Sequence, residues 1–237
     1  MMPQLNAILR QLKELGTDQT RKTFARHGID GDVFGVRVGD LKQVAKALRG
    51  EQHLAEDLYA SGNYDAKYLA GLIADGRKMS QAAIQDWADQ AKWHAIASTA
   101  VAWIASESDA AEELATLWIA ADRELLQTAG WVTFCGIVAT KADDGLDLKG
   151  LRALLRGMKK RIARAPNRVR YAMNNFIISA GCYVPALSEL ARDVAAGIGV
   201  VEVDMGETAC QVPDAVASIE KVAAMKRIGL KRKTMRC

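Results

Sequence analysis

The sequence predicts an all-helical fold, and three observations lead to this prediction. Apolar residues recur at helical spacing along nearly the whole chain, with Gly, Asn or Asp between the periodic segments. No segment shows the sustained alternation of β-branched residues that a strand requires. Apolar residues make up 50% of the 237 residues, which is enough to bury a substantial core. We therefore expect almost no strand.

Thirteen helices are predicted in order along the chain. Gly39 is followed by Asp40 and Leu41 at the start of the third, Ser80 is placed as an N-cap of the sixth, and Gly181 is placed just past the end of the eleventh. Pro185 and Pro213 open the last two, where a proline is tolerated. The predicted ranges are 4–15, 18–27, 38–48, 52–60, 64–74, 80–90, 92–105, 109–120, 124–140, 148–164, 167–180, 185–196 and 213–225.

The connections between these helices are short, which makes consecutive helices antiparallel neighbours. Many short antiparallel helices in series predict a solenoid of HEAT-like helix pairs with degenerate repeats, forming one domain over residues 1–237. A compact irregular helical bundle is the alternative. The longest break, Gly197 to Val212, is predicted to be a loop with a short extended piece, either functional or a simple connector.

Positive charge is concentrated in the last third of the chain. Nine basic and no acidic residues lie between Asp147 and Glu189, and seven basic and no acidic residues follow Glu220. The other sixteen Lys and Arg of the chain face 28 Asp and Glu. This separation of charge indicates a polyanionic partner on one side of the molecule.

One predicted helix, 148–164, carries most of these cations on one face. Lys149, Arg152, Arg156 and Lys160 recur at three- and four-residue spacing, with Leu151, Leu154, Leu155, Met158 and Ile162 on the other side. A solvated surface helix normally mixes charge signs, because like charges one turn apart repel each other. Polyanion binding is therefore favoured over a simple solvated face. The start of the next helix adds Asn, Tyr and a helix N-terminus, which also suit phosphate.

The residues expected to contact the polyanion are Lys149, Arg152, Arg156, Lys159, Lys160, Arg164, Arg168, Arg170, Tyr171, Asn174 and Asn175. The basic tail, 226–237, is predicted to be mobile, and either reaches across a phosphate backbone or has no specific role. Trp93 stands out among five tryptophans because Lys92-Trp93-His94 opens a helix, where a side chain either projects from the rim or is buried. His94 is the histidine most suited to a site.

Several classes of function are not indicated. The cysteines, Cys135, Cys182, Cys210 and Cys237, are scattered without metal-ligand spacing, and Cys135 and Cys182 are expected to be buried thiols. Phosphate-loop, zinc-protease, nucleophile-elbow and dinucleotide motifs are missing. No apolar run is long enough for a membrane span, and the N-terminus does not look like a signal peptide. We expect a cytoplasmic, monomeric protein that needs no metal or cofactor.

In three groups of residues, within 34–41, 54–93 and 169–237, the sequence resembles the AlkD-type DNA alkylation repair family. The first is Phe34-Gly35-Val36-Arg37-Val38-Gly39-Asp40-Leu41, followed by a Lys-rich helix. The second contains Leu54 to Leu58, Ala66 to Ala70, and Lys78-Met79-Ser80 leading to Trp93. The third contains Val169 to Phe176, Val203 to Cys210 and Gly229 to Cys237, and looks like one bacterial branch of the family. Their order and spacing extend the similarity over nearly the whole chain.

This resemblance implies a right-handed solenoid whose concave surface holds duplex DNA. Active members of the family hydrolyse the N-glycosidic bond of alkylated purines without a metal, using two tryptophans, an aspartate and an arginine. Trp93 matches the first tryptophan. Ala97 stands at the aspartate position, Gln127 or Thr128 at the arginine position, and Asn175 at that of the second tryptophan. Removing one preorganised electrostatic group commonly costs 10²- to 10³-fold in rate, so excision by the usual groups is not expected.

Three hypotheses follow. The first is a DNA-binding family member that recognises damaged or distorted duplex, with phosphates on the basic helix and with Trp93, His94, Tyr171, Asn174 and Asn175 facing the distorted site. The second keeps alkylpurine glycosylase activity and replaces the missing aspartate by His94, Asp86 or Asp89. The third is a helical scaffold that binds an acidic protein or RNA through the same surface.

Overall fold

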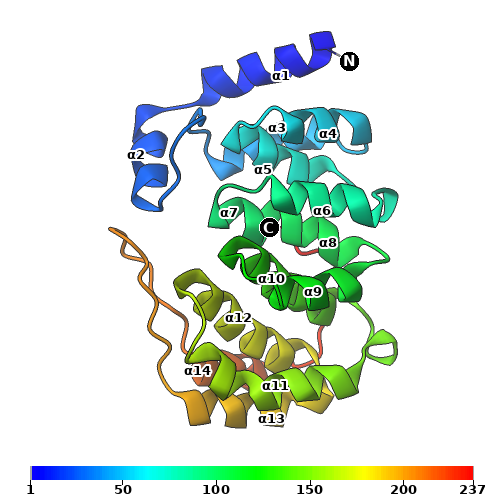
Figure 1. The fold of residues 1–237 in the computed structure, drawn as a ribbon, viewed down its shortest axis with the longest axis vertical. Helices are drawn as coiled ribbons and strands as arrows, with labels where there is room; N and C mark the ends of the chain where they lie inside the picture. Colours follow the sequence, from blue (N-terminus) through cyan, green and yellow to red (C-terminus); the bar gives the residue numbers. More distant parts are fainter. Residues whose placement is uncertain (1, 237) are drawn as a thin grey trace. The chain divides into compact units, whose positions relative to one another are not determined.

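The computed structural model describes residues 2–236, and helices form all of the regular secondary structure among them (Figure 1). The all-helical prediction is confirmed. The chain forms two compact units. The first contains the residues up to Asp109 together with Met205–Ala209, and the second contains Ala110–Asp204 and the residues from Cys210 onward. No helix in the described part of the chain is long and apolar enough to cross a membrane.

The first unit contains eight α-helices and two shorter helical segments, close to the predicted positions. They are α1 (Met2–Leu15), α2 (Asp18–Arg26), α3 (Val38–Ala47), α4 (Gln52–Ala60), α5 (Tyr64–Ile73), η1 (Gly76–Lys78), α6 (Gln81–Asp89), α7 (His94–Ile96), η2 (Ala97–Val101) and α8 (Ala102–Glu107). The predicted N-cap is confirmed, because Ser80 Oγ accepts the Ala83 N–H at 3.2 Å.

The central helix of this unit is α5, which is buried on nearly all sides. At its C-terminal end α5 approaches η2 so closely that a Cβ on Gly71 would lie 2.5 Å from Ala100 Cβ. The segment η2 is π-helical, so the predicted helix 92–105 is interrupted by a wider turn. Apolar periodicity does not reveal one extra residue in a turn, which is why the sequence indicated a continuous helix.

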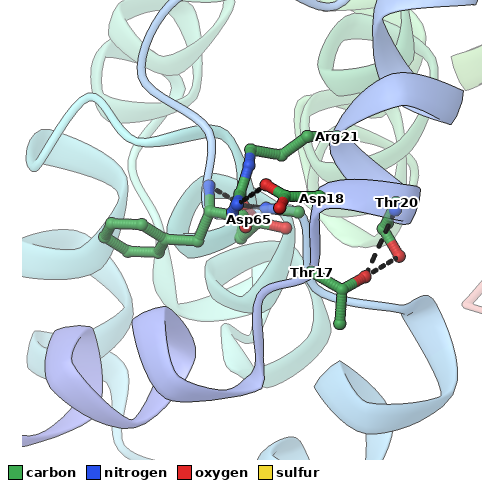
Figure 2. Close-up of polar contacts among 7 residues, drawn as sticks. Thr17, Asp18, Thr20, Arg21 and Asp65 are labelled. Atoms are coloured by element: carbon green, nitrogen blue, oxygen red, sulfur yellow. Dashed lines mark hydrogen bonds and ion pairs between the residues drawn. The ribbon is translucent and has the colours of Figure 1, made fainter.

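The loop before α3 is held by a buried carboxylate. Asp65 Oδ2 accepts the N–H groups of Phe34 (2.7 Å) and Gly35 (3.0 Å), and Asp65 Oδ1 accepts that of Val36 (2.9 Å). Burial raises the pKa of Asp65, and the three backbone donors oppose this rise. From the other side, Arg21 Nη1 donates to the Phe34 carbonyl at 2.7 Å (Figure 2). The Phe34 to Leu41 motif is therefore a structural element of this unit.

A lysine is buried in the same unit. The Lys67 side chain is only 1% exposed, and its ammonium lies 3.7 Å from the centroid of the Tyr59 ring. That ring stacks on Trp87 with a centroid separation of 3.9 Å, and Tyr59 Oη donates to the Trp87 carbonyl at 2.6 Å. Burial, with a smaller effect of the Lys92 charge, lowers the pKa of Lys67 to about 8. The aromatic ring provides a favourable contact for the remaining charge.

The second unit contains six α-helices and a 3₁₀ turn. They are α9 (Ala111–Ile119), α10 (Glu124–Thr140), η3 (Asp143–Gly145), α11 (Leu148–Ile162), α12 (Asn167–Tyr183), α13 (Pro185–Ile198) and α14 (Ala215–Ala224). The two long helices α10 and α12 pack side by side, with α9 against α10 and with α13 and α14 against α12 (Figure 1).

Aromatic rings fill the interface between α10 and α12. The rings of Trp131, Phe134 and Phe176 have centroid separations of 5.3 to 6.2 Å. Burying a large apolar side chain contributes about 1.5–3 kcal/mol relative to leaving it exposed, so this cluster is a main source of stability in the unit. Cys135 and Cys182 are buried free thiols, as predicted, and burial raises the pKa of Cys135 to about 12.

The prediction for Gly181 is wrong. The helix continues to Tyr183, and Gly181 lies inside it with ordinary helical geometry. A Cβ on Gly181 would lie 2.5 Å from Ile219 Cδ1 and 3.2 Å from Ala191 Cβ. This glycine therefore allows α13 and α14 to approach α12 closely. It does not end the helix.

The long break in the helices is a loop, displaced slightly from its predicted bounds. It runs over residues 199–214 between α13 and α14, and none of its residues is part of a strand. In Figure 1 it is the orange excursion that leaves α13 and returns to α14. The extended piece predicted within it is therefore not a strand.

Candidate nucleic-acid interface

Helix α11 separates an apolar face from a cationic one, as the sequence predicts. Its side toward the core buries Leu151, Leu155, Met158 and Ile162. Its outer side carries five cations that we call the basic face: Lys149, Arg152, Arg156, Lys159 and Lys160. All of these are exposed except Arg152, which is half-buried.

The charge of the basic face is not neutralised by neighbouring acids. None of its five side chains forms an ion pair or hydrogen bond with another residue in the range 2–236. The acid that precedes the helix, Asp147, caps it, with its Oδ1 accepting the Gly150 N–H at 3.0 Å. No acidic residue follows until Glu189. The cations of α11 are therefore available to an external anion.

Arg164 and the start of α12 extend the cationic region. Arg164 is exposed, and Arg168 and Arg170 are half-buried. The N-terminus of α12, which the sequence suggested as a phosphate site, already has an anionic partner. Glu124 Oε1 accepts the Arg168 N–H at 2.8 Å. A carboxylate at a helix N-terminus is favourable for the same electrostatic reason as a phosphate.

Two asparagines of α12 hold the loop 199–214. Asn167 binds the backbone of Asp204 twice, donating to its carbonyl at 2.8 Å and accepting its N–H at 2.8 Å. Asn174 donates to the Pro213 carbonyl at 2.8 Å and is only 2% exposed. Asn174 therefore does not face solvent or DNA in this structure, which corrects its predicted position. Tyr171 and Asn175 are half-buried.

Two buried polar atoms lack a hydrogen-bond partner within residues 2–236, and both belong to the first two turns of long helices. They are Thr128 Oγ1 on α10 and Arg170 Nε on α12. The guanidinium of Arg170 donates one long hydrogen bond within residues 2–236, from Nη2 to Asn167 Oδ1 at 3.4 Å. The half-buried guanidinium is therefore incompletely satisfied by the protein.

The basic tail contacts the second unit, and its predicted mobility stays a prediction. Lys231 Nζ donates to the Val138 carbonyl at 2.9 Å and lies 2.7 Å from Asp143 Oδ1. Arg232 N–H donates to the Ala139 carbonyl at 2.8 Å. These carbonyls belong to the last turn of α10, where cations and donors are favourable. Cys237 lies outside the described residues.

The tail and the start of α12 do not form one patch. Gly229 N–H donates to the Cys182 carbonyl at 2.9 Å, so the tail contacts the C-terminal end of α12. Arg168 lies fourteen residues earlier, about 21 Å along the helix. Sequence reasoning grouped these cations because they share a sign, and only the fold shows that they lie at opposite ends of α12.

Trp93 is buried in the first unit and is not exposed at a rim. Its side chain is 6% exposed, and its ring contacts that of Tyr64 edge-on at 5.5 Å. Its indole N–H donates to Asp30 Oδ1 at 3.3 Å. Sequence reasoning missed Asp30 because it is 63 residues away from Trp93. His94 is half-buried and begins α7.

The other positions assigned by the resemblance offer little for catalysis. Ala97 is buried in the π-helical segment, at 1% exposure. Gln127 Nε2 donates to the Ala121 carbonyl at 2.7 Å, and the adjacent Thr128 is buried. Asp86 and Asp89 are exposed, and Asp86 Oδ2 accepts Gln90 Nε2 at 2.6 Å.

Comparison with known families identifies this chain. Residues 8–194 match the family described as DNA alkylation repair enzyme. The chain belongs to this family. It is 34% identical over 217 residues to Lmo0209 of Listeria monocytogenes, which is uncharacterised, and 33% identical to Lin0241 of Listeria innocua, also uncharacterised. Each comparison covers 89% of this chain and 93% of the relative.

A solved structure shows the same fold. It matches with a TM-score of 0.89 and 36% sequence identity, over 98% of this chain and 99% of the other. That structure is described as a new family of proteins related to the HEAT-like repeat DNA glycosylases, with affinity for branched DNA structures. The HEAT-like fold predicted for this DNA alkylation repair family member is therefore confirmed, and the compact-bundle alternative is not.

Proposed function

We propose that this protein binds DNA as a monomer through the basic face of α11 and the neighbouring cations Arg164, Arg168 and Arg170, and that it prefers distorted or branched duplex. The observation that carries the proposal is the uncompensated charge of the basic face, whose five cations have no acidic partner among the described residues. The solved relative with affinity for branched DNA supports this choice of polyanion.

The spacing of the basic face suits a phosphate backbone. Residues 149 to 160 extend about 17 Å along the helix axis. Adjacent phosphates of one DNA strand follow one another at roughly 3.4 Å along the duplex axis, so several can lie within reach of long Lys and Arg side chains. Contacts of this kind position DNA without reading its sequence. A preference among DNA structures would then come from how the backbone bends past α11.

The decisive experiment changes the basic face and measures the salt dependence of DNA binding. Fluorescence anisotropy with a four-way junction and with a linear duplex of equal length gives Kd from 50 to 300 mM salt. For Lys149→Gln, Arg156→Gln and Lys160→Gln combined, we expect binding on the order of tenfold to a hundredfold weaker near 100 mM salt. The log-log salt slope should become less steep by about 2–3, because each lost phosphate contact contributes about 0.9.

A control with the same loss of charge distinguishes position from net charge. Lys13, Lys22 and Lys46 are exposed and belong to α1, α2 and α3. Changing all three to Gln should reduce affinity far less than the α11 substitutions. Equal losses in the two triple variants, or wild-type binding without salt dependence, would show that the basic face is not the interface. Comparable affinity for an acidic protein would favour a scaffold role.

Base excision is a second candidate because one carboxylate does contact Trp93. Asp30 is exposed and accepts the indole N–H of Trp93, so it provides the carboxylate beside this tryptophan that Ala97 lacks. A carboxylate near the departing base would stabilise positive charge on the deoxyribose. The test incubates the protein with oligonucleotides that carry N3- or N7-alkylated purines and measures the free base that is released. We expect no release above background from the wild type. Release that is lost in Asp30→Asn would establish excision instead.

A further inference from the structure

Arg170 is unusual among the cations of the proposed interface, because the protein both encloses it and leaves it unsatisfied. Its guanidinium has five N–H donors. The described structure provides one acceptor, Asn167 Oδ1, at 3.4 Å from Nη2, and Nε is buried without any. A buried donor without an acceptor is destabilising, because it has lost its hydrogen bond to water. A group of this kind calls for an explanation, and a bound anion provides one.

The acceptors near Arg170 are already used by other donors. Glu124 Oε1 accepts the Arg168 N–H at 2.8 Å, and Asn167 Oδ1 also accepts the Asp204 N–H at 2.8 Å. No acidic residue occurs from 148 to 188, and Arg170 forms no ion pair in the described part of the chain. Arg170 is therefore half-buried and has no ion-pair partner among residues 2–236.

The position of Arg170 on α12 is fixed on both sides. Asn167 and Asn174 lie three residues before it and four residues after it, on the same face of the helix. These asparagines bind the two ends of the loop segment 204–213, about 10 Å apart along the helix. The backbone that carries Arg170 is therefore held in place, while its long side chain can still turn toward an anion.

We propose that Arg170 binds one phosphate group through its guanidinium fork, in a subsite distinct from the exposed cations of α11. This inference rests on the proposed function and names a specific contact within it. The planar fork matches two phosphate oxygens, which a lysine cannot do. The anion reaches the exposed part of the half-buried side chain, and Nε gains its missing acceptor as the fork turns toward the anion.

The test compares Arg170→Lys, which keeps the charge and removes the fork, with Arg170→Met, which removes both. In anisotropy titrations we expect Arg170→Met to weaken DNA binding about tenfold and to reduce the salt slope by about 0.9. Arg170→Lys should weaken binding several-fold with an unchanged slope. The Tm without DNA should stay equal or rise in Arg170→Met, because the unsatisfied donor is gone. A purely structural arginine would show the opposite, a lower Tm.

Two controls keep the outcome unambiguous. Arg161→Lys changes an exposed arginine of α11 that lies about 100° around the helix from Lys160, and it should leave affinity unchanged. Asn167→Ala removes the one acceptor that the Arg170 guanidinium has among the described residues, and also one anchor of the loop. If Asn167→Ala reproduces the whole affinity loss of Arg170→Met, Arg170 acts through the loop and the subsite is wrong.

Free inorganic phosphate distinguishes the two sources of the anion. A rise in wild-type Tm with phosphate, compared with chloride at equal ionic strength, that is lost in Arg170→Met identifies a subsite open to any phosphate. If Arg170→Met weakens DNA binding but phosphate does not raise the Tm of the wild type, the subsite binds only the phosphates of the DNA backbone. Wild-type affinity in both Arg170 variants, with DNA binding still lost in the α11 triple variant, would overturn the subsite and leave the proposed function intact. If the wild type does not bind DNA, the proposed function fails and the phosphate titration alone decides the subsite.

Discussion

At the level of single residues, the environment of a side chain decides its role more than its type does. Asn174 and Arg170 both lie in the motif that resembles the repair family, and both were expected to face DNA. Asn174 is buried and donates a hydrogen bond to the Pro213 carbonyl, whereas Arg170 is half-buried and its Nε has no acceptor among the described residues. The sequence could not distinguish these two roles, because the residue that accepts the hydrogen bond from Asn174 lies 39 positions away in the chain.

The buried ammonium of Lys67 should make the stability of the first unit depend on pH. The pKa of Lys67 is lowered to about 8 from 10.5, so between these values the unfolded chain binds more protons than the folded one. The free energy of unfolding therefore rises as pH increases from about 8, by at most about 1.4 kcal/mol per pH unit. Below pH 8 the full cost of burying the charge is present.

The measurement is urea unfolding of wild type and Lys67→Met at several values between pH 7 and 9.5. Methionine fills a similar volume against the Tyr59 ring without a charge. We expect Lys67→Met to gain stability relative to wild type at pH 7, and this gain to shrink by about 1–2 kcal/mol toward pH 9.5. Asp86, Lys92 and Tyr59 remain in both proteins, so the comparison isolates the effect of the Lys67 ammonium. A difference that is constant with pH would mean that Lys67 keeps its proton in the folded protein over this range, so that burial does not lower its pKa as far as stated.

At the level of helices, the strength of the local pattern determined what the sequence predicted well. The apolar and cationic faces of α11 are set by spacing within one helix, and the structure has them where the sequence placed them. Boundaries that depend on a distant neighbour were missed. Gly181 looked like a helix end, but the close approach of Ile219 and Ala191 explains why this position is a glycine.

Two glycine substitutions test this explanation of Gly181. Gly181→Ala places a methyl group 2.5 Å from Ile219 Cδ1, and we expect a loss of about 1–3 kcal/mol in the free energy of unfolding. Gly197→Ala, in the last turn of α13, meets no atom within 4 Å. It should gain about 0.5–1 kcal/mol from improved helix propensity. Chemical denaturation of both variants provides the measurement, and a stabilised Gly181→Ala would contradict the packing explanation.

For the whole molecule, the helical class and the order of the helices followed from the sequence, because short connections and one dominant periodicity leave few alternatives. Charge was harder to interpret. The two basic blocks look like one feature in the sequence, yet Lys231 and Arg232 of the second block bind the end of α10. Those interactions depend on where the chain returns, which neither composition nor spacing contains. The candidate site could therefore be predicted for α11 and only in part for α12.

The burial of every tryptophan has a practical consequence for experiments on DNA binding. Trp87, Trp93 and Trp103 belong to the first unit, Trp118 and Trp131 belong to the second, and none is more than 6% exposed. Nucleobases quench indole emission when they stack on it, and no indole here is open to stacking. DNA that binds to the basic face should therefore leave the intrinsic fluorescence almost unchanged. Any quenching on titration would report a rearrangement of the protein core, and single Trp→Phe variants would reveal in which unit it occurs.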